Sequence, residues 1–112
     1  MRKLMVVAAA ALTAVIAAVP APSHAAPALS WWSDDFSEDQ NVCVDRAKGA
    51  FAREGWTGIA VQGTAGISVN ANKGKLAAVI LCIDASVIVV VSGGDGDLAP
   101  NERDRLKYYM KD

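Results

Sequence analysis

The stretch from Lys75 to Gly94 reads KLAAVILCIDASVIVVVSGG, and it decides the fold. Its apolar, largely β-branched residues are interrupted in the middle by Asp-Ala-Ser, a combination typical of two strands joined by a tight turn. The stretch therefore predicts the strands Lys75–Ile83 and Val87–Ser92, paired as an antiparallel hairpin. A strand with one face in water alternates apolar and polar residues, and neither of these strands does so. Both faces of the hairpin are thus apolar.

Further strands and a helix flank this hairpin. Short β-branched runs separated by glycine predict the strands Gly58–Gln62 and Gly66–Ala71 upstream of it. Downstream, the glycines of Gly93–Gly96 end the strand pattern. Asp97 can cap a final helix there, because Pro100 is tolerated in a first helical turn and basic residues follow late in the segment. The chain therefore continues from the hairpin into a C-terminal helix.

A longer helix precedes the strands, and the sequence predicts it over Glu38–Glu54. Ser37 and Gln40 have the spacing of a capping box at its start. Gly55 is suited to end the helix, with Trp56 packing back on the last turn. Apolar residues recur at the spacing of one helical face: Cys43, Ala47, Ala50 and Phe51.

These elements define an α+β domain. We expect an antiparallel meander of three to four strands, with an N-terminal and a C-terminal helix packed on one face and one disulfide. If Cys43 points inward from its helix, Cys82 must face the helices as well. Alternation then puts three more residues on that side: Leu76, Ala78 and Ile80. Pointing away are Ala77, Val79, Leu81 and Ile83, with either Ile88 and Val90 or Val87, Val89 and Val91 beside them.

The first 25 residues have the three parts of a cleavable secretory signal. These parts are the basic Arg2 and Lys3, the apolar run Leu4–Val19, and small residues at the −3 and −1 positions, Ser23 and Ala25. The competing interpretation is a membrane anchor, but the run of 16 residues is shorter than the ~20 that a span needs. We therefore divide the chain into a signal peptide (1–25), an N-terminal lead-in (26–36), of which Ala26–Ser30 is expected to be flexible, and one domain (37–112). The protein is expected in a bacterial periplasm or outside the cell.

Cleavage would leave 87 residues with two cysteines and no histidine, because the only histidine, His24, lies in the signal. A domain this small buries only ~60–65% of its unfolded surface and gains much from a disulfide. A Cys43–Cys82 bond also ties up both thiols, which removes the usual nucleophiles and soft-metal ligands. Nine basic and 12 acidic residues speak against a nucleic acid or an anionic membrane as partner. We predict no cofactor.

A set of structural motifs runs from Cys43 to Gly93. The set consists of Cys43-x-x-Arg46-Ala47, Gly55 followed by an aromatic residue, Ser68-Val69, Gly74, Ala77-Ala78-x-x-x-Cys82 and a valine-rich strand ending in glycine. With these motifs, about half of the chain resembles a type of small secreted bacterial protein with no known activity. The resemblance implies a helix cysteine paired with a central-strand cysteine and no particular chemistry. Where its pattern has a glycine after the second strand this chain has Ala71, so the register of Gly66–Ala71 stays open.

The apolar residues that point away from the helices form a candidate interface, because a contiguous apolar surface patch usually marks one. Its members are Val79, Leu81 and Ile83, together with Trp31 and Trp32 of the lead-in. Three coverings are open: a second copy of the chain, a different partner, or the chain's own segment with Trp31, Trp32 and Phe36. Our first hypothesis is therefore a non-enzymatic interaction module that forms a homodimer or binds an unidentified protein.

Two acidic groups allow other functions. Asp34, Asp35 and Glu38 could act as acid and base in a small carboxylate-dependent hydrolase, as could Asp95 and Asp97. Asp95 and Asp97 could also bind calcium in a calcium-stabilised ligand-binding domain, although their spacing does not fit an EF-hand loop. The simpler interpretations are carboxylates at a helix start and a glycine turn into a helix. We predict no catalytic residue and no metal site.

Expression of the full chain in a bacterial host is expected to export it and to remove residues 1–25, since these have the organisation of a signal peptide. Intact mass and N-terminal sequencing of the exported protein check this, with Ala26 expected as the first residue. Ala25→Arg is the control, because a large charged residue at the −1 position should prevent cleavage at that bond. A protein that keeps Met1 contradicts the prediction.

Overall fold

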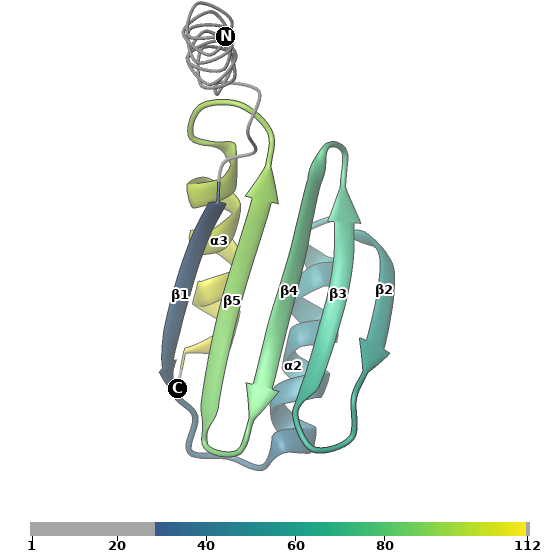
Figure 1. The fold of residues 1–112 in the computed structure, drawn as a ribbon, viewed down its shortest axis with the longest axis vertical. Helices are drawn as coiled ribbons and strands as arrows, with labels where there is room; N and C mark the ends of the chain where they lie inside the picture. Colours follow the sequence, from purple (N-terminus) through teal and green to yellow (C-terminus); the bar gives the residue numbers. More distant parts are fainter. Residues whose placement is uncertain (1–28, 112) are drawn as a thin grey trace, which may run out of the picture.

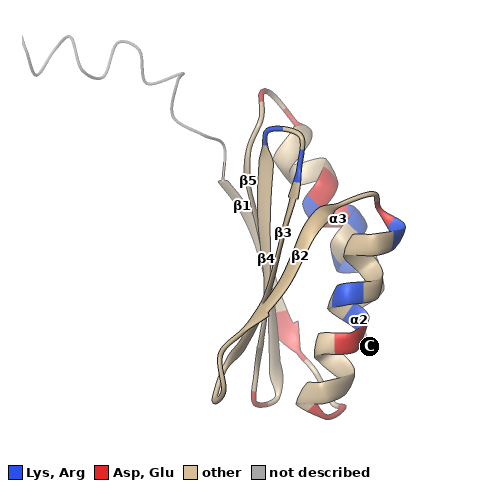
Figure 2. Ribbon diagram, turned by 90° about the vertical axis from the view of Figure 1, so that its right-hand side faces the viewer, with Lys and Arg blue, Asp and Glu red and all other residues tan. Residues whose placement is uncertain are grey.

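The structure, a computed structural model, describes residues 29–111, so the signal-like segment lies outside it. Its helices and strands are β1 (Leu29–Asp35), α2 (Gln40–Arg53), β2 (Thr57–Gln62), β3 (Ile67–Lys73), β4 (Leu76–Ile83), β5 (Ser86–Gly93) and α3 (Leu98–Met110). The strands form one antiparallel five-stranded sheet in the order β1-β5-β4-β3-β2. Both helices cover the same side of it (Figure 1, Figure 2). The expected α+β class and antiparallel meander are confirmed.

The prediction of three to four strands with a helix at the N-terminal end of the domain is wrong. The described chain begins with a fifth strand, β1, in the segment 26–36 that the sequence analysis treats as a lead-in to the domain. β1 pairs with β5 along its whole length, from Leu29 opposite Ser92 to Asp35 opposite Ser86. Without it, β5 would be an edge strand with unpaired backbone N–H and C=O groups, and pairing satisfies them. The chain then passes through α2 to β2 at the opposite edge of the sheet (Figure 1).

The start of α2 also differs from the expectation. The helix begins at Gln40 rather than Glu38, so Gln40 does not occupy the third position of a capping box headed by Ser37. Its side chain instead donates hydrogen bonds from Nε2 to the carbonyl oxygens of Cys82, at 2.6 Å, and Ala65, at 3.1 Å. The Gln40 side chain therefore makes a tertiary contact to the end of β4 and to Ala65 instead of a capping-box bond.

The C-terminal end of α2 is as expected. Gly55 follows the helix with a φ of +79°, a conformation that glycine adopts without strain. The N–H of Trp56 donates to the carbonyl oxygen of Phe51 at 2.9 Å, and the two rings meet edge to face with centroids 5.4 Å apart. Trp56 thus packs back on the last turn of the helix and becomes part of the core.

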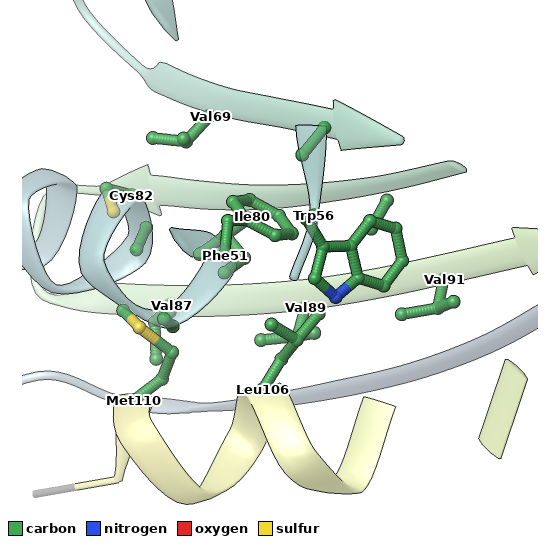
Figure 3. Close-up of a cluster of buried hydrophobic side chains, with 14 of the residues drawn as sticks. Phe51, Trp56, Val69, Ile80, Cys82, Val87, Val89, Val91, Leu106 and Met110 are labelled. Atoms are coloured by element: carbon green, nitrogen blue, oxygen red, sulfur yellow. The ribbon is translucent and has the colours of Figure 1, made fainter. Parts of the chain in front are cut away.

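The core fills the space between the sheet and the two helices (Figure 3). On β4, the buried residues are those that the sequence predicted to face the helices: Leu76, Ala78, Ile80 and Cys82. On β5, the sequence left two alternatives, and the buried set is Val87, Val89 and Val91. The helices contribute Ala47, Ala50 and Phe51 from α2, and Ala99, Leu106 and Met110 from α3. α2 packs on β2, β3 and β4, whereas α3 packs on β5 and β1, so the helices divide the sheet between them.

Cys43 of α2 and Cys82 of β4 form the expected disulfide, and both residues are buried. Their Cα atoms lie 6.0 Å apart and the two residues are separated by 39 positions in the sequence. The bond therefore joins the first turn of α2 to the end of the central strand β4 and closes a long loop of chain. In the chain-entropy model, a cross-link restricts the unfolded chain more as the loop it closes becomes longer.

β3 is longer than expected, since it ends at Lys73 rather than Ala71. Lys73 lies opposite the buried Leu76, so it faces the helices. Its Nζ donates to both carboxylate oxygens of Glu102 on α3, at 2.9 and 3.2 Å. Glu102 is buried, and this ion pair ties the last helix to the β3–β4 hairpin.

Removal of the disulfide by the double variant Cys43→Ala/Cys82→Ala is expected to lower the free energy of unfolding by about 3–4 kcal/mol, because the bond closes a long loop in the unfolded chain. Urea unfolding followed by circular dichroism measures the difference. Reduced wild-type protein is the matched control, because it loses the cross-link without losing side-chain volume. A loss below about 1 kcal/mol in both comparisons contradicts the prediction.

Candidate interaction surface

The side of the sheet that faces away from the helices is the open face. Residues paired across an antiparallel sheet point to the same side, so the rows of this face follow from the strand register. One row consists of Trp31, Val90, Val79 and Asn70, and the next of Ser33, Ile88, Leu81 and Ser68. The open face is therefore apolar over β5 and β4 and becomes polar at β3.

Apolar residues from three adjacent strands form a continuous stripe on the open face. This open-face stripe consists of Leu29 and Trp31 of β1, Ile88 and Val90 of β5, and Ala77, Val79, Leu81 and Ile83 of β4. Trp31 is 61% exposed and Leu29 68%, whereas the residues in the centre shield one another and are half-buried. A continuous apolar patch of this kind is a candidate interaction surface, whereas scattered apolar residues are not.

The open face is almost free of charge. Within the five strands, charged residues occur at only three positions: Asp34, Asp35 and Lys73. Asp34 and Lys73 lie on the helix side, because they pair with the buried Val87 and Leu76. Only Asp35, at the end of β1, belongs to the open face. The other charged residues of the described chain lie on the helices and in the loops (Figure 2).

The structure brings together four of the five residues predicted for the interface: Trp31, Val79, Leu81 and Ile83. Trp32 points the other way, because it pairs with the buried Val89 and packs on the core, with Nζ of Lys107 5.9 Å from its ring centroid. Phe36 is buried as well. The segment with these aromatic residues extends the sheet instead of lying across the open face, so no described residue covers that face.

The acidic residues Asp34, Asp35 and Glu38, considered for catalysis, lie at the end of β1 and just before α2. Asp34 and Asp35 are neighbours on a strand, so their side chains point to opposite sides of the sheet. The N–H of Asp35 donates to Oδ1 of Asp34 at 2.8 Å, and Glu38 forms an ion pair with Arg46. All three carboxylates are exposed. An acid and a base must face the same bond of a substrate, and strand alternation does not place Asp34 and Asp35 in that way.

Asp95 and Asp97 lie in the turn between β5 and α3, and both are exposed. Their backbone carbonyl oxygens accept hydrogen bonds from the N–H groups of Leu98, at 3.3 Å, and Asn101, at 3.0 Å. The side chain of Asp97, expected to cap α3, makes no capping bond. In the described part of the chain, no group of three or more His, Cys, Asp or Glu residues is placed to hold a metal ion. The turn connects β5 to α3 through Gly93, Gly94 and Gly96, which all have positive φ.

A groove of about 460 Å³ between α2 and α3 has no counterpart in the sequence analysis. It is lined by residues of α2, among them Val42, Arg46 and Arg53, and by Tyr109 of α3. Arg46 is already engaged, because it pairs with Glu38 and its guanidinium lies over the ring of Phe36. Helical periodicity predicts which face of each helix is buried, but not how the two helices lie against each other. The sequence pattern therefore does not predict this groove.

Comparison with known proteins provides no information on the open face. The chain matches no family model, and no curated protein or solved structure matches it. Within residues 29–111, neither helix combines the length and the apolar character needed to cross a membrane.

Tyr109 links the two helices, because its hydroxyl donates to Oε2 of Glu54 at 2.9 Å. This hydrogen bond, followed by desolvation and the charge of Glu54, raises the pKa of Tyr109 above its ordinary value of 10.0. The folded protein therefore stabilises the protonated hydroxyl. The resulting contribution to the free energy of unfolding is complete below the ordinary pKa of tyrosine, and it is lost as the pH rises through the raised pKa of Tyr109.

Tyr109→Phe is accordingly expected to lower the urea midpoint at neutral pH, with a smaller difference from wild type at strongly alkaline pH. Urea titrations at several pH values measure this dependence. Tyr108→Phe is the matched control, because the neighbouring Tyr108 is exposed. This variant should have the urea midpoint of the wild type at both neutral and alkaline pH. Equal midpoints for Tyr109→Phe and wild type at neutral pH would show that the link contributes nothing.

Proposed function

We propose that this protein is a non-enzymatic interaction module, exported to a bacterial periplasm or the cell exterior, that pairs with a second copy of itself through the open face. The observation that carries the proposal is the open-face stripe, an uncharged apolar surface over three strands with no described residue above it. Such a surface is unfavourable in water, and its burial against a partner stabilises the complex.

The size of the open face is compatible with a dimer. Five strands ~4.8 Å apart, each about seven residues long at ~3.3 Å per residue, span about 24 by 23 Å. Pairing would bury about 550 Å² on each copy, or about 1,100 Å² in total, close to the ~1,200 Å² at the lower end of specific interfaces. The open-face stripe would form the apolar centre. Ser68 and Asn70 of β3 would form part of a polar rim, which is the usual anatomy of an interface.

The neutrality of the open face favours a second copy as its occupant. A two-fold dimer brings the same patch of both subunits together, so a charge near the axis would meet its own equivalent. The open face avoids this, because Asp35 at the end of β1 is the only charged strand residue on it. A foreign partner is commonly selected by complementary charges, and this face offers only Asp35, at the end of β1. Two such sheets would pack ~10 Å apart with their strands roughly aligned.

The disulfide supports the proposed location. Disulfides persist in oxidising compartments such as the periplasm and the cell exterior and are rare in the cytosol, and the one bond here is Cys43–Cys82. The signal-like segment Met1–Ala25, outside the described residues, points the same way. The bacterial origin rests on the resemblance of the motifs from Cys43 to Gly93.

Leu81→Lys is expected to weaken face-to-face association at least ~100-fold, about 3 kcal/mol, because pairing would bury two unpaired ammonium groups. A single copy should tolerate the change, since Leu81 is only half-buried and a lysine side chain can reach water. Sedimentation equilibrium of the oxidised protein from micromolar to millimolar concentration measures the association.

Asn101→Lys is the matched control, because it adds the same charge at an exposed position of α3, on the other side of the molecule. It should associate like wild type. The proposal fails if the wild type is monomeric throughout this range, or if Leu81→Lys associates as tightly as wild type.

A further inference from the structure

β2 forms one edge of the sheet, and all six of its residues are exposed (Figure 1). Its sequence, TGIAVQ, contains no charged residue and no proline. Two apolar side chains are prominent, because Ile59 is 36% exposed and Val61 47%. No described strand pairs with the outer side of β2, so the backbone N–H and C=O groups there are open to another strand.

The opposite edge is protected in ways that β2 is not. β1 ends in two aspartates, and Arg103 of α3 reaches this strand, with Nη1 donating to the carbonyl oxygen of Trp31 at 3.5 Å. Charged side chains and covering elements are the usual means by which proteins prevent edge pairing. β2 has only an irregular register near its start, where Gly58 has a φ of +63°. Its second half, Ala60–Gln62, is regularly paired to β3 and has no such protection.

The helix side of β2 shows what an added strand would cover. Val61 lies opposite Val69, whose side chain is fully buried, so Val61 points toward the helix side of the sheet. α2 packs over β3 and β4 as well as β2, and it leaves Val61 and Ile59 in contact with water. A strand added at this edge would place its own apolar side chains beside these two.

We propose that β2 pairs antiparallel with β2 of a second copy, so that two sheets join edge to edge into one. A two-fold axis perpendicular to the sheet at Ala60 sets Ile59 opposite Val61 of the partner subunit. Because β2 is uncharged, no like charges meet across this axis. Backbone hydrogen bonds provide affinity, and the β-branched pairs specify the register. A copy of α2 then lies on each side of the buried apolar strip.

This edge contact is independent of the proposed face contact, because it uses the backbone of β2 and not the open-face stripe. The two axes also differ in direction, since the edge axis is perpendicular to the sheet and the face axis lies parallel to its plane. When both contacts form and the axes meet, the assembly closes as a tetramer with D2 symmetry, in which two joined sheets are stacked on their open faces.

The test compares the masses of four forms of the oxidised, exported protein by sedimentation equilibrium: wild type, Leu81→Lys, Val61→Lys and the double variant. With both contacts present, the expected states are tetramer, dimer, dimer and monomer. Lysine is chosen because natural edge strands use it against pairing, and Val61 is exposed in the single copy. Val61→Thr is the matched control, because it stays β-branched and uncharged and should associate like wild type.

Two results overturn the edge contact: a Val61→Lys variant that associates like wild type, or a wild type whose association Leu81→Lys abolishes completely. If Leu81→Lys leaves the mass unchanged and Val61→Lys halves it, the edge contact stands and the face contact falls. Amide hydrogen exchange in the Leu81→Lys variant provides a readout with β2 intact. Protection of Ile59–Gln62 that increases with protein concentration supports the pairing, and exchange that does not depend on concentration overturns it.

Discussion

The structure depends on one connection, the disulfide between the first turn of α2 and the end of β4. Because Cys82 must face the helix that holds Cys43, strand alternation assigns a side to every residue of β4. The antiparallel register then transfers this assignment to β5 and β3, and from β5 to β1. Gln40 reinforces the same point, since its side chain donates to the carbonyl oxygen of Cys82. The core and the open face are therefore two results of the orientation of one strand.

The two helices cover only one side of the sheet (Figure 2), so the residues on the other side are in contact with water in a single copy. β3 behaves as a strand with one face in water: Val69 and Ala71 are buried, whereas Ser68 and Asn70 point outward. β4 and β5 in the same sheet carry apolar residues on both sides. A general preference for β-branched residues in strands would apply to β3 as well, so it does not explain the difference. The apolar outer side of β4 and β5 is not part of the core of a single copy, and the proposed face contact rests on this difference.

The parts of the fold that the sequence predicts are those with local signals. The end of α2 at Gly55 and the two sides of β4 are of this kind. β1 was missed because LSWWSDD contains no β-branched residue, and it becomes a strand by pairing with β5. The capping box failed because Gln40 bonds to β4 instead. Of the candidate interface, Trp31 and Trp32 could not be told apart until β1 was known to be a strand, since only alternation puts them on opposite sides. The exposure of β2 follows from its place at the sheet edge, which no local pattern in TGIAVQ reveals.

The two proposed contacts together account for the uneven distribution of charge. An isolated copy has two surfaces that favour uncontrolled association, the open-face stripe and the outer edge of β2. The open-face stripe and the outer edge of β2 contain no charged residue. Each could be covered by the equivalent surface of another copy. In a tetramer with both contacts, the outer edge of each β1 would stay in contact with water, with its aspartates and the nearby Arg103. The charged helices would also face water (Figure 2). Apart from Asp35 at the end of β1, the charged residues of the described chain thus lie where such an assembly would meet solvent and not where copies would meet. Natural edge strands are shielded in several ways, and this sheet shields its two edges unequally: β1 has charged side chains and a contact from Arg103, whereas β2 has only the irregular register near Gly58.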